Sequence, residues 1–308
     1  MAAITLLDLN WTGRPRSIAA CLLESDGHSA LVDPGPAATL ETLRAQLRSR
    51  GLAVADLNAV LLTHIHLDHA AATGALLREN PRLAVYVHKL GAPHLADPAK
   101  LMASAKRLYG ENIQRLFGEF LPVPQENLRI LEGGETLAFG ARKLDVVYTP
   151  GHASHHVSYF DSLEGVAFIG DTGGIRIQGQ ALILPATPPP DINMELWYAS
   201  LNAIAARRPA RLLLTHFGFV RDAADHLSRY RERLREWTAL AGELLRTHAD
   251  EAAAARAFVE QMEGEILRAL PAAEAAHYIF NGGLDLSWMG LARYWRKRAD
   301  AAQPPHSR

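Results

Sequence analysis

Three histidines and one aspartate lie within six positions of the segment "LLTHIHLDHAAATG", residues 61–74: they are His64, His66, Asp68 and His69. Neutral imidazole nitrogens and carboxylate oxygens together suit zinc, iron or manganese. Because alternate side chains of an extended segment point to the same side, His64 and His66 can share one metal ion. Asp68 and His69 begin the next helix and can face a neighbouring position. The cluster therefore predicts a metal centre, and this one short loop could provide ligands for two metal ions.

Three further segments end an apolar run at a residue that can bind a metal. They are "YTPGHASHH" with His152, "FIGDTGG" with Asp171 and "LLLTHFG" with His216. Sites assemble at strand ends in open α/β sheets, because the sheet is rigid and the following loops present side chains. Seven ligands at four strand ends would complete a two-metal site. The roles of His155 and His156, in the first of these segments, stay open among three alternatives: a place at the pocket rim, support of the ligands, and no role in the site.

Short apolar runs bounded by Gly and Pro, such as "SIAACLLE" and "GVAFIGDT", predict the strands that must position these residues. Residues 88–127 mix polar and apolar side chains and are interpreted as an inserted helical cap. After the rigid loop "ILPATPPPDI", Asp191 is the candidate N-cap of a helix that runs to about Ala206. From Asp222 onward, apolar side chains spaced by three and four predict a C-terminal helical extension over 222–308.

Composition excludes several classes of protein. A formal net charge of -1 over 308 residues argues against a polyanion-binding surface, so we expect no nucleic-acid partner. The single cysteine, Cys21, excludes a disulfide framework and a cysteine-built zinc site. The first residues lack a signal-peptide pattern, and no apolar run reaches about 18 residues. We therefore expect a cytoplasmic protein with no membrane partner, in which a homodimer could form through the helical extension.

The motifs "VDPG", "THIHLDH", "TPGH", "GDT" and "LLTHFG" follow one another over about residues 18–218. In this order they resemble the metallo-beta-lactamase superfamily. The resemblance implies an α/β fold, an αββα sandwich of two mixed sheets with the metals at one edge. We expect the sandwich domain to span 1–221, with the cap at 88–127 inserted in it and the extension at 222–308 following it.

The resemblance also implies a role for each motif residue. The first metal would be held by His64, His66 and His152, and the second by Asp68, His69 and His216. Asp171 would bridge the two, and Asp33 of "VDPG" would orient the ligand loop from behind the ligands, a support that metal sites generally need. The cofactors expected are two divalent ions, most readily zinc, with iron or manganese as alternatives.

Two metals about 3.5 to 4 Å apart can share a hydroxide, because bound water loses its proton near neutral pH. That hydroxide would attack a carbonyl polarised by the first metal, and Asp68 would take the proton and help pass it to the leaving group. The many apolar side chains of the cap and extension suit an apolar acyl or aromatic small-molecule substrate. We therefore expect a binuclear hydrolase of carboxylic esters or lactones.

Alternative activities within the superfamily stay open. Glutathione thioester hydrolases, or glyoxalase II enzymes, carry more basic residues after the bridging aspartate, where this chain has only Arg176. Acyl-homoserine lactonases place a tyrosine there, so Tyr109 or Tyr198 would have to reach the site from elsewhere. A persulfide dioxygenase would hold one iron through His64, His152 and Asp171. A phosphodiesterase or nuclease would need a basic track that the chain lacks.

The other histidines carry no expected role. They are read as surface or helix residues: His28, His226, His248, His277 and His306.

Overall fold

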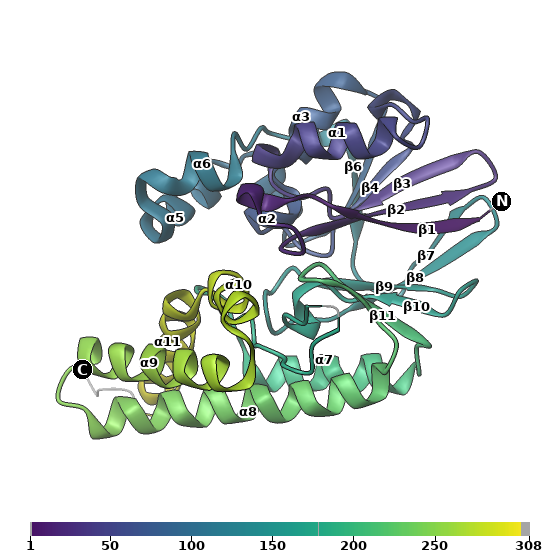
Figure 1. Ribbon diagram of the computed structural model, residues 1–308. Coiled ribbons are helices and arrows are strands. Elements are labelled where there is room, and N and C mark those ends of the chain that lie inside the picture. Colours follow the sequence, from purple (N-terminus) through teal and green to yellow (C-terminus); the bar gives the residue numbers. More distant parts are fainter. Residues whose placement is uncertain (1, 178, 303–308) are drawn as a thin grey trace.

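The computed structural model describes residues 2–177 and 179–302, and two sheets of six strands form the centre of this part of the chain (Figure 1). The first half of the chain supplies one sheet, in the order β1(Ala3–Asp8), β2(Ala19–Ser25), β3(His28–Val32), β4(Ala59–Leu61), β5(Ala84–His88) and β6(Leu128–Leu131). The second sheet has the order β12(Gly218–Val220), β11(Arg211–Leu214), β10(Val166–Phe168), β9(Val157–Asp161), β8(Arg142–Tyr148) and β7(Thr136–Phe139).

Both sheets are mixed, and their parallel pairs bring the ligand-bearing strand ends to one edge. Strand β3 pairs in parallel with β4, β4 with β5, and β5 with β6. In the second sheet β10 pairs in parallel with β11, while β9 runs antiparallel to both β8 and β10. Strands β8, β10 and β11 therefore point the same way, so the loops that follow them leave from the same edge.

Strand β4 shows why the strands read as continuous apolar runs. Its three residues are buried, and they alternate between two cores. Ala59 and Leu61 pack against the other sheet, with Leu144, Phe168 and other side chains between the sheets. Val60 packs on the outer face, among the helices of the first half. Both faces of the sheet are covered, so alternation of apolar and polar residues is absent from this strand.

Helices cover the outer face of each sheet. On the first sheet these are α1(Leu40–Arg48), α2(Leu67–Ala70) and α3(Thr73–Glu79), and on the second they are α7(Met194–Ala206) and α8(Ala223–Thr247). This layering confirms the predicted αββα sandwich. The predicted N-cap of α7 was wrong: Asn193 caps the helix by accepting a hydrogen bond from the Leu196 N–H, while Asp191 accepts one from the Ser154 N–H.

Two helical groups lie beyond the sandwich at the same end (Figure 1). The segment predicted as a cap contains α4(Ala92–Ala96), α5(Ala99–Tyr109) and α6(Ile113–Phe117). The C-terminal extension continues from α8 through α9(Glu251–Ala269), α10(Ala272–Gly282) and α11(Leu284–Ala302). In Figure 1, α5 and α6 lie opposite α10 and α11. The division of the chain into a sandwich domain over 1–221 and a helical extension over 222–308 stays a prediction. None of the helices in the described residues has the length and apolar character to cross a membrane.

Candidate metal centre

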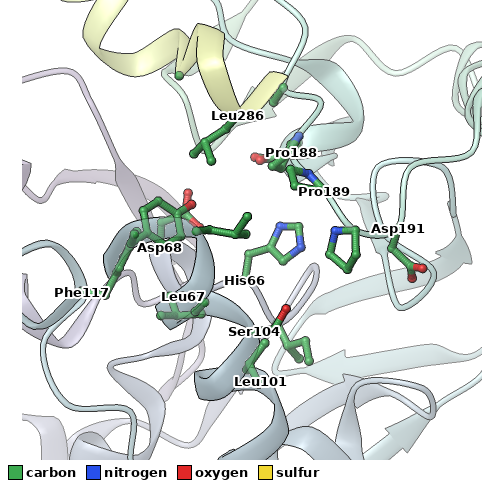
Figure 2. A pocket seen from close by; sticks show the side chains of 18 of the residues that line it. His66, Leu67, Asp68, Leu101, Ser104, Phe117, Pro188, Pro189, Asp191 and Leu286 are labelled. Atoms are coloured by element: carbon green, nitrogen blue, oxygen red, sulfur yellow. The ribbon is translucent and has the colours of Figure 1, made fainter. Parts of the chain in front are cut away.

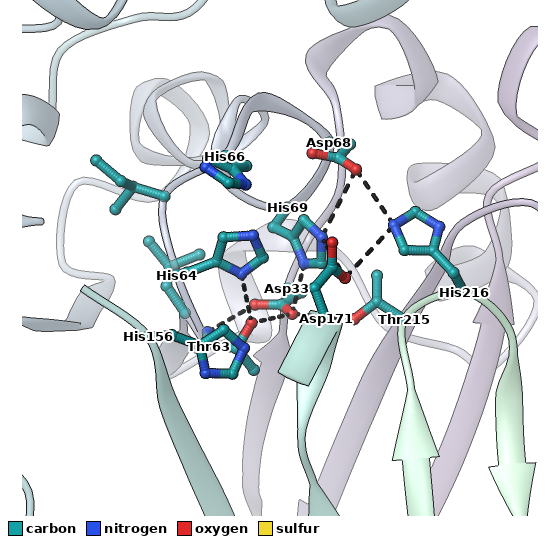
Figure 3. Close-up of polar contacts among 12 residues, drawn as sticks. Asp33, Thr63, His64, His66, Asp68, His69, His156, Asp171, Thr215 and His216 are labelled. Carbon is teal, nitrogen blue, oxygen red and sulfur yellow. Dashed lines mark hydrogen bonds and ion pairs between the residues drawn. The ribbon is translucent and has the colours of Figure 1, made fainter. Parts of the chain in front are cut away.

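The seven predicted ligands come together at the edge where the strands end. Figure 3 labels all of them except His152. Strand β4 ends at Leu61, and the turn and helix α2 that follow carry four of them. Asp171 lies on a 3₁₀ turn, Gly170–Gly173, after β10. His152 follows β8, and His216 follows β11. His64 and His216, far apart in the sequence, thus meet because the strands that precede them end at one edge.

The side chains form two groups, each with ligand atoms within 4.8 Å of one another. One group contains His64, His66 and His152. The other contains Asp68, His69, Asp171 and His216. This division coincides with the grouping that the family resemblance implies, although the assignment of each residue to a metal stays a prediction.

The carboxylate of Asp171 faces both groups. Its Oδ2 lies 3.5 Å from Nε2 of His152, in the first group. Its Oδ1 lies 3.2 Å from Nε2 of His69 and 3.6 Å from Nε2 of His216, in the second. Asp68, also in the second group, has its Oδ2 3.2 Å from Nε2 of His216. Asp171 can therefore offer one oxygen to each of two neighbouring cations.

Four of the five histidines among the predicted ligands are oriented by a hydrogen bond at Nδ1. His69 donates to Asp33 Oδ2 at 2.8 Å, and His64 donates to Thr63 Oγ1 at 3.1 Å. His152 and His216 donate to backbone carbonyl oxygens, of Ala186 and Ser17 respectively, each at 2.8 Å. With the hydrogen on Nδ1, each Nε2 presents a lone pair toward the centre, which is the arrangement of metal-binding histidines. His66 instead presents Nδ1, 2.9 Å from His152 Nε2.

Several of the converging atoms are buried without a hydrogen bond. Within the described part of the chain this holds for His64 Nε2, and also for His69 Nε2 and Asp171 Oδ1, which lie 3.2 Å apart as an ion pair. A buried polar atom left unpaired costs free energy, so a native structure normally satisfies it. Nitrogen and oxygen donors in this number suit divalent ions such as zinc. The residues therefore fit a pair of divalent cations.

Charges in the two groups differ. Burial, with smaller contributions from neighbouring histidines, lowers the pKa of His64 well below its ordinary value and that of His66 to about 3. In the second group burial also opposes protonation, but the charges of Asp171 and Asp68 raise the pKa of His69 well above its ordinary value. Burial would raise the pKa of Asp68, yet the charge of His69 and the hydrogen bond from His216 lower it to about 2. The carboxylates thus attract positive charge, which a metal ion would supply in place of protons.

Asp33 organises the site from behind and adds two residues that the sequence reading missed. Its Oδ2 accepts hydrogen bonds from His69 Nδ1, Thr63 Oγ1 and Thr215 Oγ1, and its Oδ1 accepts one from the Thr63 N–H. Thr63 and Thr215 occupy equivalent places in "LLTH", which occurs at 61–64 and again at 213–216. That repeat was the signal for two strand ends that converge on one carboxylate.

A cavity of about 520 Å³ opens onto the metal centre (Figure 2). His66, Asp68, Asp171 and His216 lie at its inner end. The cap and the extension provide most of the remaining wall, and Figure 2 shows Leu286 of α11 facing Leu101 of α5 across it. The apolar side chains of the wall include Trp11, Ile65, Leu101, Leu108, Leu116, Phe117, Ile175, Phe280 and Leu286.

The structure shows which of the residues with an open role line the cavity. Tyr109 lines the cavity, and burial, together with the charges of Asp68 and Asp171, raises its pKa. Tyr198 lies against the guanidinium of Arg231 and is not among the described residues that line the cavity. His155 lines the cavity, whereas His156 is fully buried, with Nδ1 3.0 Å from Thr149 Oγ1.

Arg176 and His226 lie behind the site. Arg176 pairs with Asp222 at 3.0 Å and accordingly does not reach the cavity. His226 lies on helix α8, as expected, but it is fully buried and its Nε2 donates to the Gly173 carbonyl oxygen at 2.9 Å. It thereby holds the turn that carries Asp171. His28 is exposed, and His306 lies outside the described residues.

Comparison with known proteins agrees with this architecture. The sequence model of the metallo-beta-lactamase superfamily matches residues 13–216, more than half of the chain. The chain therefore belongs to the metallo-beta-lactamase superfamily. Two solved structures match nearly the whole fold. A metallo-beta-lactamase superfamily protein of Sulfolobus tokodaii has a TM-score of 0.66 and 19% identity, and the match covers 94% of this chain and 98% of that one. A metallo-beta-lactamase family protein of Thermus thermophilus has a TM-score of 0.70 and 21% identity, and the match covers 96% of this chain and 94% of that one.

Curated relatives match only part of the chain. The metallo-beta-lactamase fold-containing protein of Sulfurisphaera tokodaii is 29% identical over 167 residues, which are 53% of this chain and 62% of that protein. A hydroxyacylglutathione hydrolase of Cupriavidus metallidurans is 32% identical over 186 residues, 59% of this chain and 56% of that enzyme. The chain thus spans less than two thirds of the length of either relative.

Proposed function

We propose that the protein is a metal-dependent hydrolase that cleaves carboxylic esters or lactones with an apolar acyl or aromatic group. The observation that carries the proposal is the apolar cavity whose inner end is formed by the paired clusters of ligands. Pockets with apolar walls and a few convergent polar groups select substrates that are apolar apart from the reacting bond. We further propose that the two clusters bind two ions, most readily zinc.

Divalent cations, when bound, supply Lewis acidity that promotes ionisation of water and polarises a substrate carbonyl. The chain contributes the geometry around them. Asp171 faces both clusters, and Asp33 holds the ring of His69 through its Nδ1 hydrogen. Asp68 lines the cavity, so its carboxylate is placed to accept a proton during attack and to return it to the leaving oxygen. The apolar wall excludes water from the acyl group.

Thioester hydrolysis is the second candidate, because several curated relatives are hydroxyacylglutathione hydrolases. The lining of the cavity argues against glutathione as the leaving group. Among its described residues Lys100 is the only lysine or arginine, whereas the tripeptide carries two carboxylates. The same scarcity of cations argues against phosphodiester backbones. Retention of both clusters argues against an enzyme with one iron, since the second group would then have no use.

The proposal is tested by elemental analysis of protein purified without added metal, combined with a hydrolysis screen. Para-nitrophenyl esters, lactones, hydroxyacylglutathione thioesters and phosphodiesters would be compared at equal protein and metal content. We expect about two metals per chain and the highest kcat/KM on esters or lactones with apolar acyl groups. Preference for the glutathione thioester would reject the proposed substrate. About one iron per chain with oxygen uptake on glutathione persulfide would reject hydrolysis. Cytoplasmic location and a homodimer stay predictions.

A further inference from the structure

His155 lies at the inner end of the cavity but belongs to neither ligand cluster. It is the third residue after His152, in the loop between β8 and β9. His152, Ala153 and His156 on the same loop are fully buried, whereas Ser154 and His155 are partly exposed and line the cavity. Its ring centre is 5.7 Å from that of His66, and the two planes are perpendicular. The side chain therefore faces substrate space beside the first cluster.

One nitrogen of His155 is occupied by the backbone. The N–H of Ile65 points at His155 Nδ1 over 3.4 Å. A backbone N–H can only donate, so Nδ1 must present its lone pair and the ring hydrogen must be on Nε2. None of the described residues accepts a hydrogen bond from that Nε2. The consequence is an N–H donor that lines the cavity with no acceptor of its own.

The backbone contact leaves His155 with one free hydrogen-bonding group. Because Nδ1 accepts from the Ile65 N–H, the Nε2 hydrogen is available as a donor. In an ester or lactone, the acyl carbonyl oxygen is an acceptor that such a donor can bind.

We propose that His155 binds the substrate, donating its Nε2 hydrogen to the acyl carbonyl oxygen and so placing the carbonyl carbon next to the first cluster. This inference rests on the proposed ester or lactone hydrolysis and adds a binding residue that the metal ions do not require. No bond to His155 forms or breaks. As negative charge develops on the carbonyl oxygen during attack, the hydrogen bond strengthens, so His155 contributes more to the transition state than to substrate binding.

The test compares His155→Phe, which keeps a flat ring without a donor, with His155→Gln, whose amide N–H reaches a similar position. Para-nitrophenyl octanoate and γ-decalactone are the substrates, and octanoate is the product ligand. We expect His155→Phe to lower kcat/KM by about 100- to 1,000-fold, mostly through kcat, as loss of one such donor does. His155→Gln should restore most of the loss, and octanoate should bind more weakly to the Phe variant in calorimetry. His28→Phe, an exposed histidine, is the matched control.

Metal content and the thermal midpoint are measured on the same preparations. Unchanged kcat/KM in His155→Phe with normal metal content would overturn the inference. Equal losses in His155→Phe and His155→Gln would also overturn it, because the shape of the side chain would then matter and not its donor. If His155→Phe loses metal, His155→Leu replaces it in the same comparison. Wild-type protein without ester or lactone turnover would instead reject the proposed function, so the two failures are distinguishable.

Discussion

The carboxylate of Asp33 lies 2.8 Å from Nδ1 of His69, and both side chains are fully buried. The same oxygen accepts hydrogen bonds from hydroxyls of Thr63 and Thr215, one from each sheet. One carboxylate therefore ties the β4 loop to the β11 loop directly behind the ligands. Its removal should disturb the site without removing any ligand.

Asp33→Asn tests this relationship. The amide keeps the shape but lacks the charge, and one of its two polar atoms becomes a donor facing other donors. We expect affinity for the second metal to fall by about 10- to 100-fold, the usual effect of losing a supporting partner. Competition with a chromophoric chelator measures it. Asp225→Asn, on the exposed face of α8, is the control and should bind metal normally. Equal affinities in both variants would contradict the assigned support.

His66→Ala should remove a ligand itself. We expect one metal per chain to be lost or bound weakly, and kcat/KM to fall by more than the about 10- to 100-fold expected for a supporting residue. Elemental analysis and ester turnover on the same sample measure both effects. His28→Ala serves as control. Near-normal turnover together with unchanged metal content would sink the assignment of His66.

His226 should make stability depend on pH. Burial, the largest influence on this group, lowers its folded-state pKa to about 4, whereas the unfolded chain protonates near 6.5. Between these values the unfolded state binds the extra proton, so stability contributed by the neutral ring is lost as pH falls from about 6.5 to 4. The loss approaches about 3 kcal/mol. Urea unfolding at several pH values, with His226→Phe as comparison, measures it, since the difference between the two proteins should shrink at low pH.

Gly151→Ala should displace the loop that carries His152. A methyl group on Gly151 would overlap the backbone of Trp197 in α7, and the glycine has a φ of +138°. We expect a loss of about 2 kcal/mol or more in unfolding free energy, together with weaker binding of the first metal. Gly134→Ala is the matched control, because Gly134 has a φ of +108° but open space around it. Equal losses in both variants would assign the effect to backbone strain alone.

Much of the site was predictable, because an apolar run that ends at a His or Asp encodes both a strand and the residue at its end. The apolar runs indicated the strands, whereas the αββα sandwich was predicted from the resemblance of the ordered motifs to the metallo-beta-lactamase superfamily. The N-cap of α7 was missed because Asp191 and Asn193 are both good caps, and only packing shows that Asp191 bonds the Ser154 N–H instead. The burial of His226 carried a signal, since Ala223, Leu227 and Tyr230 are buried at helical spacing beside it. Which of His155 and His156 faces the cavity depends on the loop after β8, beyond the reach of periodicity.

The inner end and the mouth of the cavity belong to different parts of the fold, and this separation affects how the protein can evolve. Its inner end belongs to strand termini that the sandwich holds rigidly, whereas opposite sides of its mouth come from helix α5, inserted in the first half, and helix α11, near the end of the chain. Substitutions on those two helices can alter which molecules enter while leaving the reacting groups untouched. Choice of substrate and ability to react are therefore separable traits, open to independent selection and to grafting between relatives.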